Sequence, residues 1–348
     1  MTTTYNGRLT SLSHGGGCGC KIAPGVLSDI LKSSPIRNLP AALLAGSDNN
    51  EDAAVYQINE NQAIVATTDF FMPIVDDPFE FGRIAATNAI SDIYAMGAQP
   101  LFALALLGMP INVLPLEVIQ QVTAGGEAVC NDAGIMIAGG HSIDTVEPIY
   151  GLVAIGLVDP KKLKRNNGAQ VGDSIILSKP IGVGILSAAL KKEILSEAGY
   201  KEMIALTTKL NKPGVALSQL AGVHALTDVT GFGLAGHLLE MARGSHLKAQ
   251  LDWDAIPVVK EAAEHVKADT FTGASTRNWA GYGNEIELAA NMALWQKNLL
   301  TDPQTSGGLL ISCSPEQEAK VLSILNLDGF TYARKIGRFV AGKGLSVA

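Results

Sequence analysis

The chain has 348 residues, of which 47% are hydrophobic and 17% charged. This length and composition are typical of a globular protein with two domains and exclude a largely disordered chain. The formal net charge of −7 argues against non-specific nucleic-acid binding as the main function.

The sequence carries no sign of membrane insertion or secretion. No apolar run reaches membrane-spanning length, and the polar residues 1–6 lack the pattern of a signal peptide. Four cysteines in so long a chain do not indicate a disulfide framework. We therefore expect a cytoplasmic protein with reduced thiols, in which Cys130 and Cys313 are buried packing residues.

Strand and helix patterns alternate after a glycine-, serine- and asparagine-rich start, residues 1–50, which contains one short helical pattern at 26–31. In the next hundred residues we expect strands at 63–68, 101–107, 135–138 and 148–158, and helices at 81–96 and 116–130. A charged, turn-rich segment at 159–168 then predicts a domain boundary.

The second half repeats the alternation. We expect strands at 174–178, 225–228, 248–252, 309–313 and 333–339, and helical regions at 184–191, 201–220, 234–242 and 315–325. The pattern predicts an α/β (α+β) fold. We divide the chain into a flexible arm (1–50), an N-terminal α/β domain (51–158) and a C-terminal α/β domain (170–348).

Residues 14–21, His-Gly-Gly-Gly-Cys-Gly-Cys-Lys, place two thiols beside a lysine in a glycine-rich segment. The thiolate is the reactive form of cysteine, and a neighbouring ammonium favours it. Glycines allow the backbone to approach a ligand closely. The pattern favours a chemical role for Cys18 and Lys21. The alternatives are a solvated lysine and a zinc site made by His14, Cys18 and Cys20, which lacks a fourth soft ligand nearby.

Acidic residues recur at comparable places along the chain. Asp52 precedes an apolar run, Asp69 and Asp228 end apolar strands, and Asp92 shares a helix face with Asn88. Carboxylates at strand ends can converge on one pocket, and oxygen ligands suit Mg²⁺ or Mn²⁺. The alternative for each aspartate is a helix cap or a closed turn. Four in comparable contexts favour a joint metal site.

Glycine-rich turns are expected at 138–142, 229–233 and 305–308, each next to a predicted strand. Backbone amides in such turns can bind phosphate. None of them matches a Walker motif, and no dinucleotide fingerprint is visible. His141 taken alone is more typical of a turn residue than of a ligand.

Together these residues resemble the selenophosphate synthetases, over nearly the whole chain. The matching segments are 9–21, 52–56, 67–97, 139–143, 227–233 and 302–308. The run Gly-Cys-Gly-Cys-Lys at 17–21 is the most specific of them. The strand-end aspartates and the Asn88–Asp92 helix are shared more widely with the aminoimidazole ribonucleotide synthetase-like ATP enzymes.

The resemblance implies a reaction in which ATP, selenide and water give selenophosphate, AMP and orthophosphate, supplying selenium for selenocysteine and selenouridine. It implies the two-domain aminoimidazole ribonucleotide synthetase-like fold, with Mg²⁺ accompanying the substrate ATP. It also implies a homodimer in which strands of both chains join across the interface. A selenium-delivery protein is a further candidate partner.

The resemblance also assigns residues. Cys18 matches the catalytic position, where some members carry selenocysteine, and Lys21 matches an essential lysine that contacts the nucleotide phosphates. The implied magnesium ligands are Asp52, Asp92 and Asp228. The implied nucleotide contacts are Lys21, Asn49, Asn50, Glu51, Asp69, Asp92, Gly140, His141 and Ser142.

We expect residues 1–50 to act as a glycine-hinged lid that brings Cys18 and Lys21 over the γ-phosphate. Two other functions remain open. A related ATP-dependent kinase or synthetase acting on a small metabolite would need the aspartates but not the thiols. A non-enzymatic selenium or metal carrier would use Cys18 and Cys20 without ATP turnover.

Overall fold

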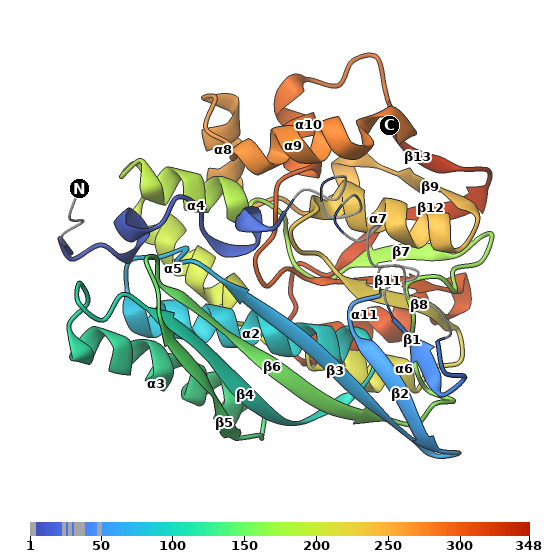
Figure 1. Cartoon of the computed structure of the whole chain (residues 1–348). Coiled ribbons are helices and arrows are strands. Elements are labelled where there is room, and N and C mark those ends of the chain that lie inside the picture. The colour runs from blue at the N-terminus through green and yellow to red at the C-terminus, as the bar shows by residue number, and fades with distance from the viewer. Residues whose placement is uncertain (1–4, 23–25, 27–29, 31–38, 47–50) are drawn as a thin grey trace.

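The computed structural model describes residues 5–22, 26, 30, 39–46 and 51–348. Two β-sheets with helices packed against them make up the described chain, which confirms the α/β class (Figure 1). The helix expected at 26–31 lies largely outside the described residues. Among the described helices, none combines the length and apolar character that crossing a bilayer requires.

The N-terminal sheet has six strands in the order β1-β2-β3-β6-β4-β5. Neighbours are antiparallel except β4 and β5, which are parallel and joined through helix α3. The strands are β1 (Leu43–Ala45), β2 (Ala54–Asn59), β3 (Gln62–Phe71), β4 (Gln99–Met109), β5 (Ile137–Asp144) and β6 (Ile149–Val158). Helices α2 (Pro78–Ala95) and α3 (Leu116–Asp132) cover one face of this sheet.

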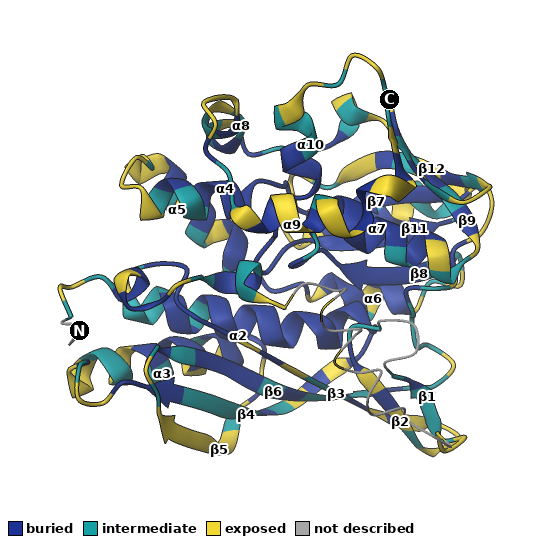
Figure 2. Cartoon of the chain, turned by 45° about the horizontal axis from the view of Figure 1, so that its top comes forward, coloured by how far each residue is buried: buried dark blue, intermediate teal, exposed yellow. Residues whose placement is uncertain are grey.

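Helix α2 lies at the centre of the molecule. Asp77 caps its N-terminus by accepting a hydrogen bond from the Glu80 amide at 2.9 Å, and Gly97, with φ of 72°, follows its end. The helix contacts β3 and β6 on one side and β8, α5 and α6 on the other. Every residue from Ile84 to Ala95 is therefore buried, as the dark ribbon in Figure 2 shows. Polar side chains in this stretch must find partners inside the protein.

The C-terminal sheet has seven strands in the order β10-β13-β9-β12-β7-β11-β8. They are β7 (Ser174–Leu177), β8 (Val223–Asp228), β9 (Leu247–Leu251), β10 (Ile286–Leu288), β11 (Leu309–Cys313), β12 (Arg334–Ala341) and β13 (Gly344–Val347). The helices are α4 (Val183–Lys191), α5 (Glu197–Thr207), α6 (Pro213–Ser218), α7 (Gly233–Gly244), α8 (Lys260–Lys267), α9 (Gly273–Tyr282), α10 (Leu294–Leu300) and α11 (Glu318–Leu327).

The expected strands and helices recur within a few residues of their predicted bounds, with three corrections. The helical region at 201–220 is wrong as one element, because Pro213 begins a separate helix, α6. Asp69 lies inside β3, not at its end. The glycine turn expected at 138–142 is wrong as well: these residues belong to β5. A Cβ at Gly140 would lie 2.1 Å from the Ala105 carbonyl oxygen, so this glycine permits close strand pairing.

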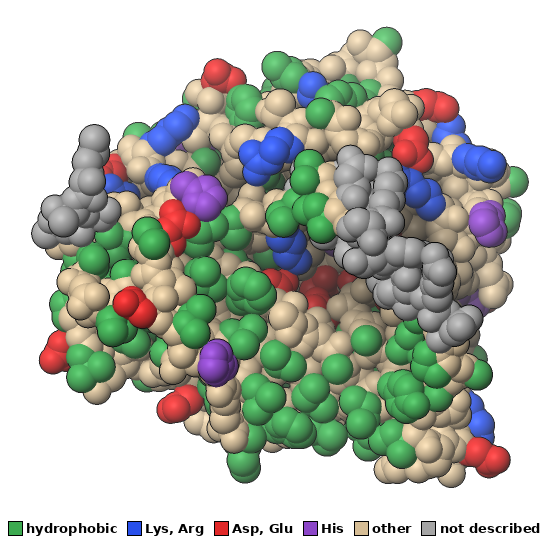
Figure 3. Space-filling model, viewed as in Figure 1, with side chains coloured by type: hydrophobic (Ala, Val, Ile, Leu, Met, Phe, Trp, Pro, Cys, Tyr) green, Lys and Arg blue, Asp and Glu red, His purple; other side chains and the backbone are tan. Residues whose placement is uncertain are grey.

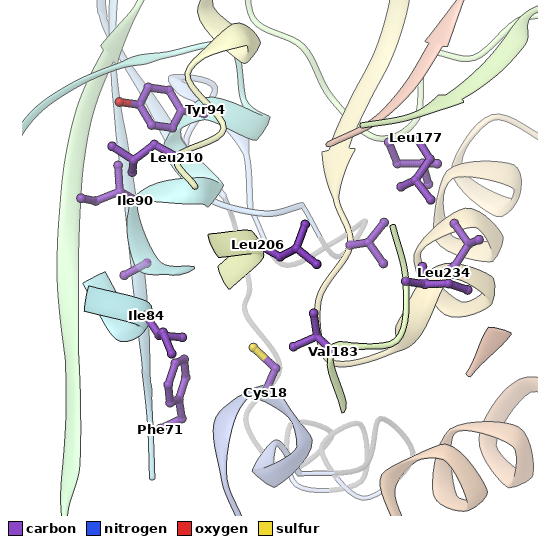
Figure 4. Packing of buried hydrophobic residues seen from close by; sticks show 14 of the residues in the cluster. Cys18, Phe71, Ile84, Ile90, Tyr94, Leu177, Val183, Leu206, Leu210 and Leu234 are labelled. Carbon is purple, nitrogen blue, oxygen red and sulfur yellow. The ribbon is translucent and has the colours of Figure 1, made fainter. Parts of the chain in front are cut away.

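The hydrophobic core is continuous between the two sheets. Cys130 and Cys313 are buried, as predicted, and all four cysteines are unpaired. Cys18 also belongs to this core, although it comes from the N-terminal arm. Figure 4 shows its sulfur between Phe71 and Ile84 on one side and Val183 on the other. The thiol segment thus lies between the two sheets.

Candidate active site

Three aspartates from separate elements converge. Asp52 precedes β2, Asp92 lies on α2, and Asp228 is the last residue of β8. One carboxylate oxygen of each lies within 4.8 Å of the others. Figure 3 shows acidic side chains at the bottom of a hollow in the middle of one face, below a basic side chain. We call Asp52, Asp92 and Asp228 the aspartate trio.

Each member of the trio is fixed by one hydroxyl donor. The donors are Thr227 to Asp52 at 2.8 Å, Thr67 to Asp92 at 2.6 Å, and Ser91 to Asp228. The second oxygen of Asp52 is buried and has no hydrogen-bond partner in the described structure. A buried carboxylate oxygen without a partner is costly, so this atom is available to a cation.

Burial raises the pKa of all three carboxyl groups. Repulsion from Asp228 raises the pKa values of Asp52 and Asp92 further, well above their ordinary value. Like charges held this close favour either protonation or a cation between them. Because all the donors are hard oxygens, the trio fits Mg²⁺ or Mn²⁺.

Lys21 and Asp69 form an ion pair beside the trio, with 3.0 Å between the Lys21 Nζ and an Asp69 oxygen. Burial alone would lower the pKa of Lys21, but Asp69, Cys18 and Asp92 together raise it well above its ordinary value. The Lys21 side chain keeps 41% of its surface exposed, whereas Asp69 keeps 6%. Lys21 is therefore a charged group that a ligand in the hollow can reach.

Asn88 connects the thiol to this ion pair. Its side-chain amide donates to Asp69 at 2.8 Å, and its oxygen accepts from the Cys18 thiol at 3.2 Å. The Cys18 amide donates to Thr305 at 3.0 Å. The sequence predicted only that Asn88 shares a helix face with Asp92. Its role in connecting the Cys18 thiol to Asp69 depends on contacts between segments far apart in sequence.

Lys21 lowers the pKa of the Cys18 thiol, as expected, but burial outweighs this effect in this conformation. Burial raises the pKa of Cys18, and the opposing effect of Lys21 is smaller. Lys21 itself is engaged by Asp69. Burial thus favours the thiol form of Cys18, which donates a hydrogen bond to the Asn88 side-chain oxygen.

The turn at 305–308 joins the C-terminal sheet to this site. The Ser306 amide donates to the Asn88 oxygen at 2.7 Å, and the buried Lys179 donates to the Ser306 carbonyl at 2.8 Å. Burial lowers the pKa of Lys179 to about 7. The glycine-rich pattern predicts that this turn binds phosphate, whereas its Ser306 amide donates a hydrogen bond to the Asn88 side chain. No sequence motif surrounds Lys179, so the sequence alone does not predict its place at this site.

The three residues of the alternative zinc site have separate partners. The His14 ring binds Glu147 at 2.9 Å, the Cys18 thiol binds Asn88, and the Cys20 thiol donates to the Gly17 carbonyl at 2.8 Å. Within the described part of the chain, only the aspartate trio forms a group of three metal-ligating side chains. The zinc alternative is therefore wrong for this arrangement.

Other predicted nucleotide contacts are not brought together with the trio. Asn49 and Asn50 lie outside the described residues. Glu51 adjoins Asp52, but one of its oxygens pairs with Arg165 at 2.8 Å and the other accepts from the Asn166 amide. Both partners lie in the chain segment that joins β6 of the first sheet to β7 of the second. Glu51 therefore anchors that segment in this structure.

Gly140, His141 and Ser142 lie on β5, at the opposite edge of the sheet from β1. Two strands, β6 and β4, separate β5 from β3, which carries Asp69. At about 4.8 Å between strands, the separation is about 14 Å or more. The chain therefore does not bring residues 140–142 into its own hollow.

Sequence comparisons give consistent matches across the chain. Residues 50–158 match the family described as AIR synthase related protein, N-terminal domain, and residues 170–348 match its C-terminal domain. A relative from Paraburkholderia xenovorans, named selenide, water dikinase, is 64% identical over 345 residues, covering 99% of this chain and 97% of its own. A relative of the same name from Rhizobium meliloti is 54% identical, covering 96% of both chains.

Solved structures share the fold at low sequence identity. Thiamine-monophosphate kinase from Stenotrophomonas maltophilia superposes with a TM-score of 0.65 and 20% identity, covering 94% of this chain and 96% of its own. Hydrogenase maturation protein HypE in complex with ATP gives a TM-score of 0.63 and 18% identity, covering 92% and 91%. At these identities the likeness concerns the fold alone.

Proposed function

This chain belongs to the selenide, water dikinase family, and from that premise we propose how its own residues serve the reaction. ATP, selenide and water give selenophosphate, AMP and orthophosphate. One observation supports the assignment of roles most strongly: Cys18 and Lys21 contact Asn88 and Asp69, in the same region as the aspartate trio. A kinase of another substrate class would have no use for that thiol.

In our proposal the aspartate trio holds magnesium together with the phosphates of ATP. The donor set supports this, since Asp52 keeps a buried oxygen without a protein partner and the three carboxylates repel one another. Bound there, Mg²⁺ would neutralise phosphate charge, which phosphoryl transfer requires. The hydroxyls of Thr67, Ser91 and Thr227 keep the carboxylates oriented for this role.

Lys21 in this proposal exchanges Asp69 for the polyphosphate. Its raised pKa keeps the ammonium charged, and its exposed part can reach an anion in the hollow. In this proposal the Cys18 sulfur lies where the selenium reacts. The Cys18 thiol and Lys21 lie three residues apart, so one movement of the arm displaces both. Gly17, with φ of 54°, is suited to act as a hinge.

The identity of the nucleotide product tests the proposed reaction. Purified protein given ATP, Mg²⁺ and selenide should produce AMP, and omitting selenide should slow this reaction. Separating the nucleotides by chromatography measures it directly. ADP as the sole final nucleotide would contradict the dikinase reaction. Selenium bound in stoichiometric amount without ATP turnover would instead support a carrier.

We further propose that the protein is a homodimer joined through the N-terminal sheet. Helices cover one face of this sheet, and the other face exposes large apolar side chains. These include Tyr56, Ile58, Ile64, Phe70 and Ile143. Strand β5 is an exposed edge, free to meet a second copy. A partner's β5 could then supply residues 140–142 to the hollow, which would reconcile their expected nucleotide contact with their distance from it.

Placing a charge on this edge tests the dimer. Ile143 is 56% exposed, so Ile143→Lys should not disturb the fold of one chain but should oppose burial against a second. We expect the wild type to sediment as a dimer of 36.4 kDa chains and the variant as a monomer with weaker ATP binding. Leu327→Lys, at an 86% exposed position on α11, is the matched control. A wild-type protein that sediments as a monomer and still binds ATP would refute the dimer.

The cellular location of the protein and the source of its selenium are further parts of the proposal. We infer a cytoplasmic location, because four cysteines with no disulfide among them suit a reducing compartment. Selenide is reactive, so we propose that a selenium-delivery protein supplies it.

A further inference from the structure

A cavity of about 340 Å³ lies beside residues 14–19 of the arm. Its walls come from the arm, from the second half of α4 at Ser187 and Lys191, and from the first half of α9 at Gly273 and Arg277. Neither the trio nor Asp69 lines it. Figure 1 shows the arm passing below α4 at this place. We call this cavity the basic pocket.

The charges around the basic pocket favour an anion. Lys191 and Arg277 line it, and neither has a carboxylate partner within ion-pair distance in the described part of the chain. Lys191 makes a long hydrogen bond to the Ser13 carbonyl at 3.4 Å. The nearby Glu147 is bound by His14. The start of α9 adds the partial positive charge of a helix N-terminus.

A second, much smaller cavity lies beside the thiol and shares part of its wall with the basic pocket. It measures about 10 Å³ and is lined by Cys18 and Lys21. Gly19, Ala274 and Arg277 line both cavities. Arg277 donates to the Gly19 carbonyl at 3.1 Å, between the two cysteines. Arg277 therefore belongs to the wall of the basic pocket and also to the wall of the small space beside Cys18.

We propose that the basic pocket admits the selenide anion to Cys18, while the aspartate side of the hollow receives ATP. This rests on the proposed function. Selenide is an anion at neutral pH, so an approach over the trio and a bound polyphosphate would be repelled. An approach past Lys191 and Arg277 is favoured by electrostatic attraction. Two neighbouring cations of this kind raise the rate at which an anion meets the site.

Two substitutions test the route without altering the trio or the thiol. Lys191→Gln removes a charge from the pocket wall, and Ser187→Phe fills its volume. We expect kcat/KM for selenide to fall by about 10-fold in each, with KM for ATP unchanged. For Lys191→Gln, kcat at saturating selenide should stay near the wild-type value. Its kcat/KM should also lose part of its dependence on ionic strength.

Lys192→Gln is the matched control, because Lys192 follows Lys191 but bonds Thr270 at 3.2 Å and does not line the pocket. Arg277→Lys should retain more activity than Arg277→Gln. Normal kcat/KM for selenide in both Lys191→Gln and Ser187→Phe would overturn the route while leaving the proposed function intact. Failure of the wild type to make AMP from selenide would instead overturn the proposed function.

Discussion

Cys18→Ser should lower selenide-dependent turnover by about 10³-fold or more while leaving Mg–ATP binding intact. Serine has nearly the same shape, and its hydroxyl can still donate to the Asn88 oxygen that the thiol now contacts at 3.2 Å. The substitution therefore removes the sulfur and preserves the local packing. Steady-state AMP production and calorimetric titration with a non-hydrolysable ATP analogue measure the two effects separately.

The neighbouring thiol provides the control. Cys20 donates to the Gly17 carbonyl at 2.8 Å, within its own segment, whereas Asn88 bonds Cys18 and Asp69. A serine hydroxyl can make the same bond, so Cys20→Ser should keep most of the activity. If Cys18→Ser turned over selenide normally, Cys18 would have no chemical role. Equal losses in both variants would point to a shared role for the thiols.

Asp92→Asn should abolish most of the magnesium-dependent affinity for nucleotide. Loss of an outer partner of a metal ligand commonly costs 10- to 100-fold in affinity, so loss of a direct ligand should cost about 100-fold or more. The amide can still accept the hydrogen bond from Thr67. It also relieves repulsion from Asp228, so the metal-free variant should melt no lower than the wild type.

Titration of nucleotide binding against Mg²⁺, with a melting curve in a chelator, gives both measurements. Asp254→Asn is the control, because Asp254 is exposed and lies away from the trio on a short turn. A normal Mg²⁺ titration for Asp92→Asn would remove Asp92 from the proposed ligands. A large loss of melting temperature would show that the carboxylate is needed for folding.

Local patterns predicted much of the fold and part of the site. Asp228 ends an apolar strand in the sequence and does so in the structure, which places it in the hollow. Lys21 follows the thiols directly, so their common location needed no tertiary information. The regular alternation of strands and helices likewise revealed the class of fold.

The remaining features depend on tertiary contacts that no local pattern contains. The glycine-rich pattern predicts a turn at Gly140, whereas its missing Cβ allows β5 to pair closely with β4. Asn88 lies in a helix pattern, yet its partners Cys18 and Ser306 are 70 and 218 residues away. The raised pKa of Cys18 follows from burial, which a glycine-rich segment gave no reason to expect.

Formation of the phosphorus–selenium bond is the most direct test of the proposed chemistry. The protein is incubated with ATP, Mg²⁺ and selenium-77-labelled selenide, and the products are followed by phosphorus NMR. We predict a new phosphorus resonance split by selenium-77, appearing together with AMP and orthophosphate and absent with Cys18→Ser. Consumption of ATP to orthophosphate alone, with no selenium-coupled signal in the wild type, would contradict the account.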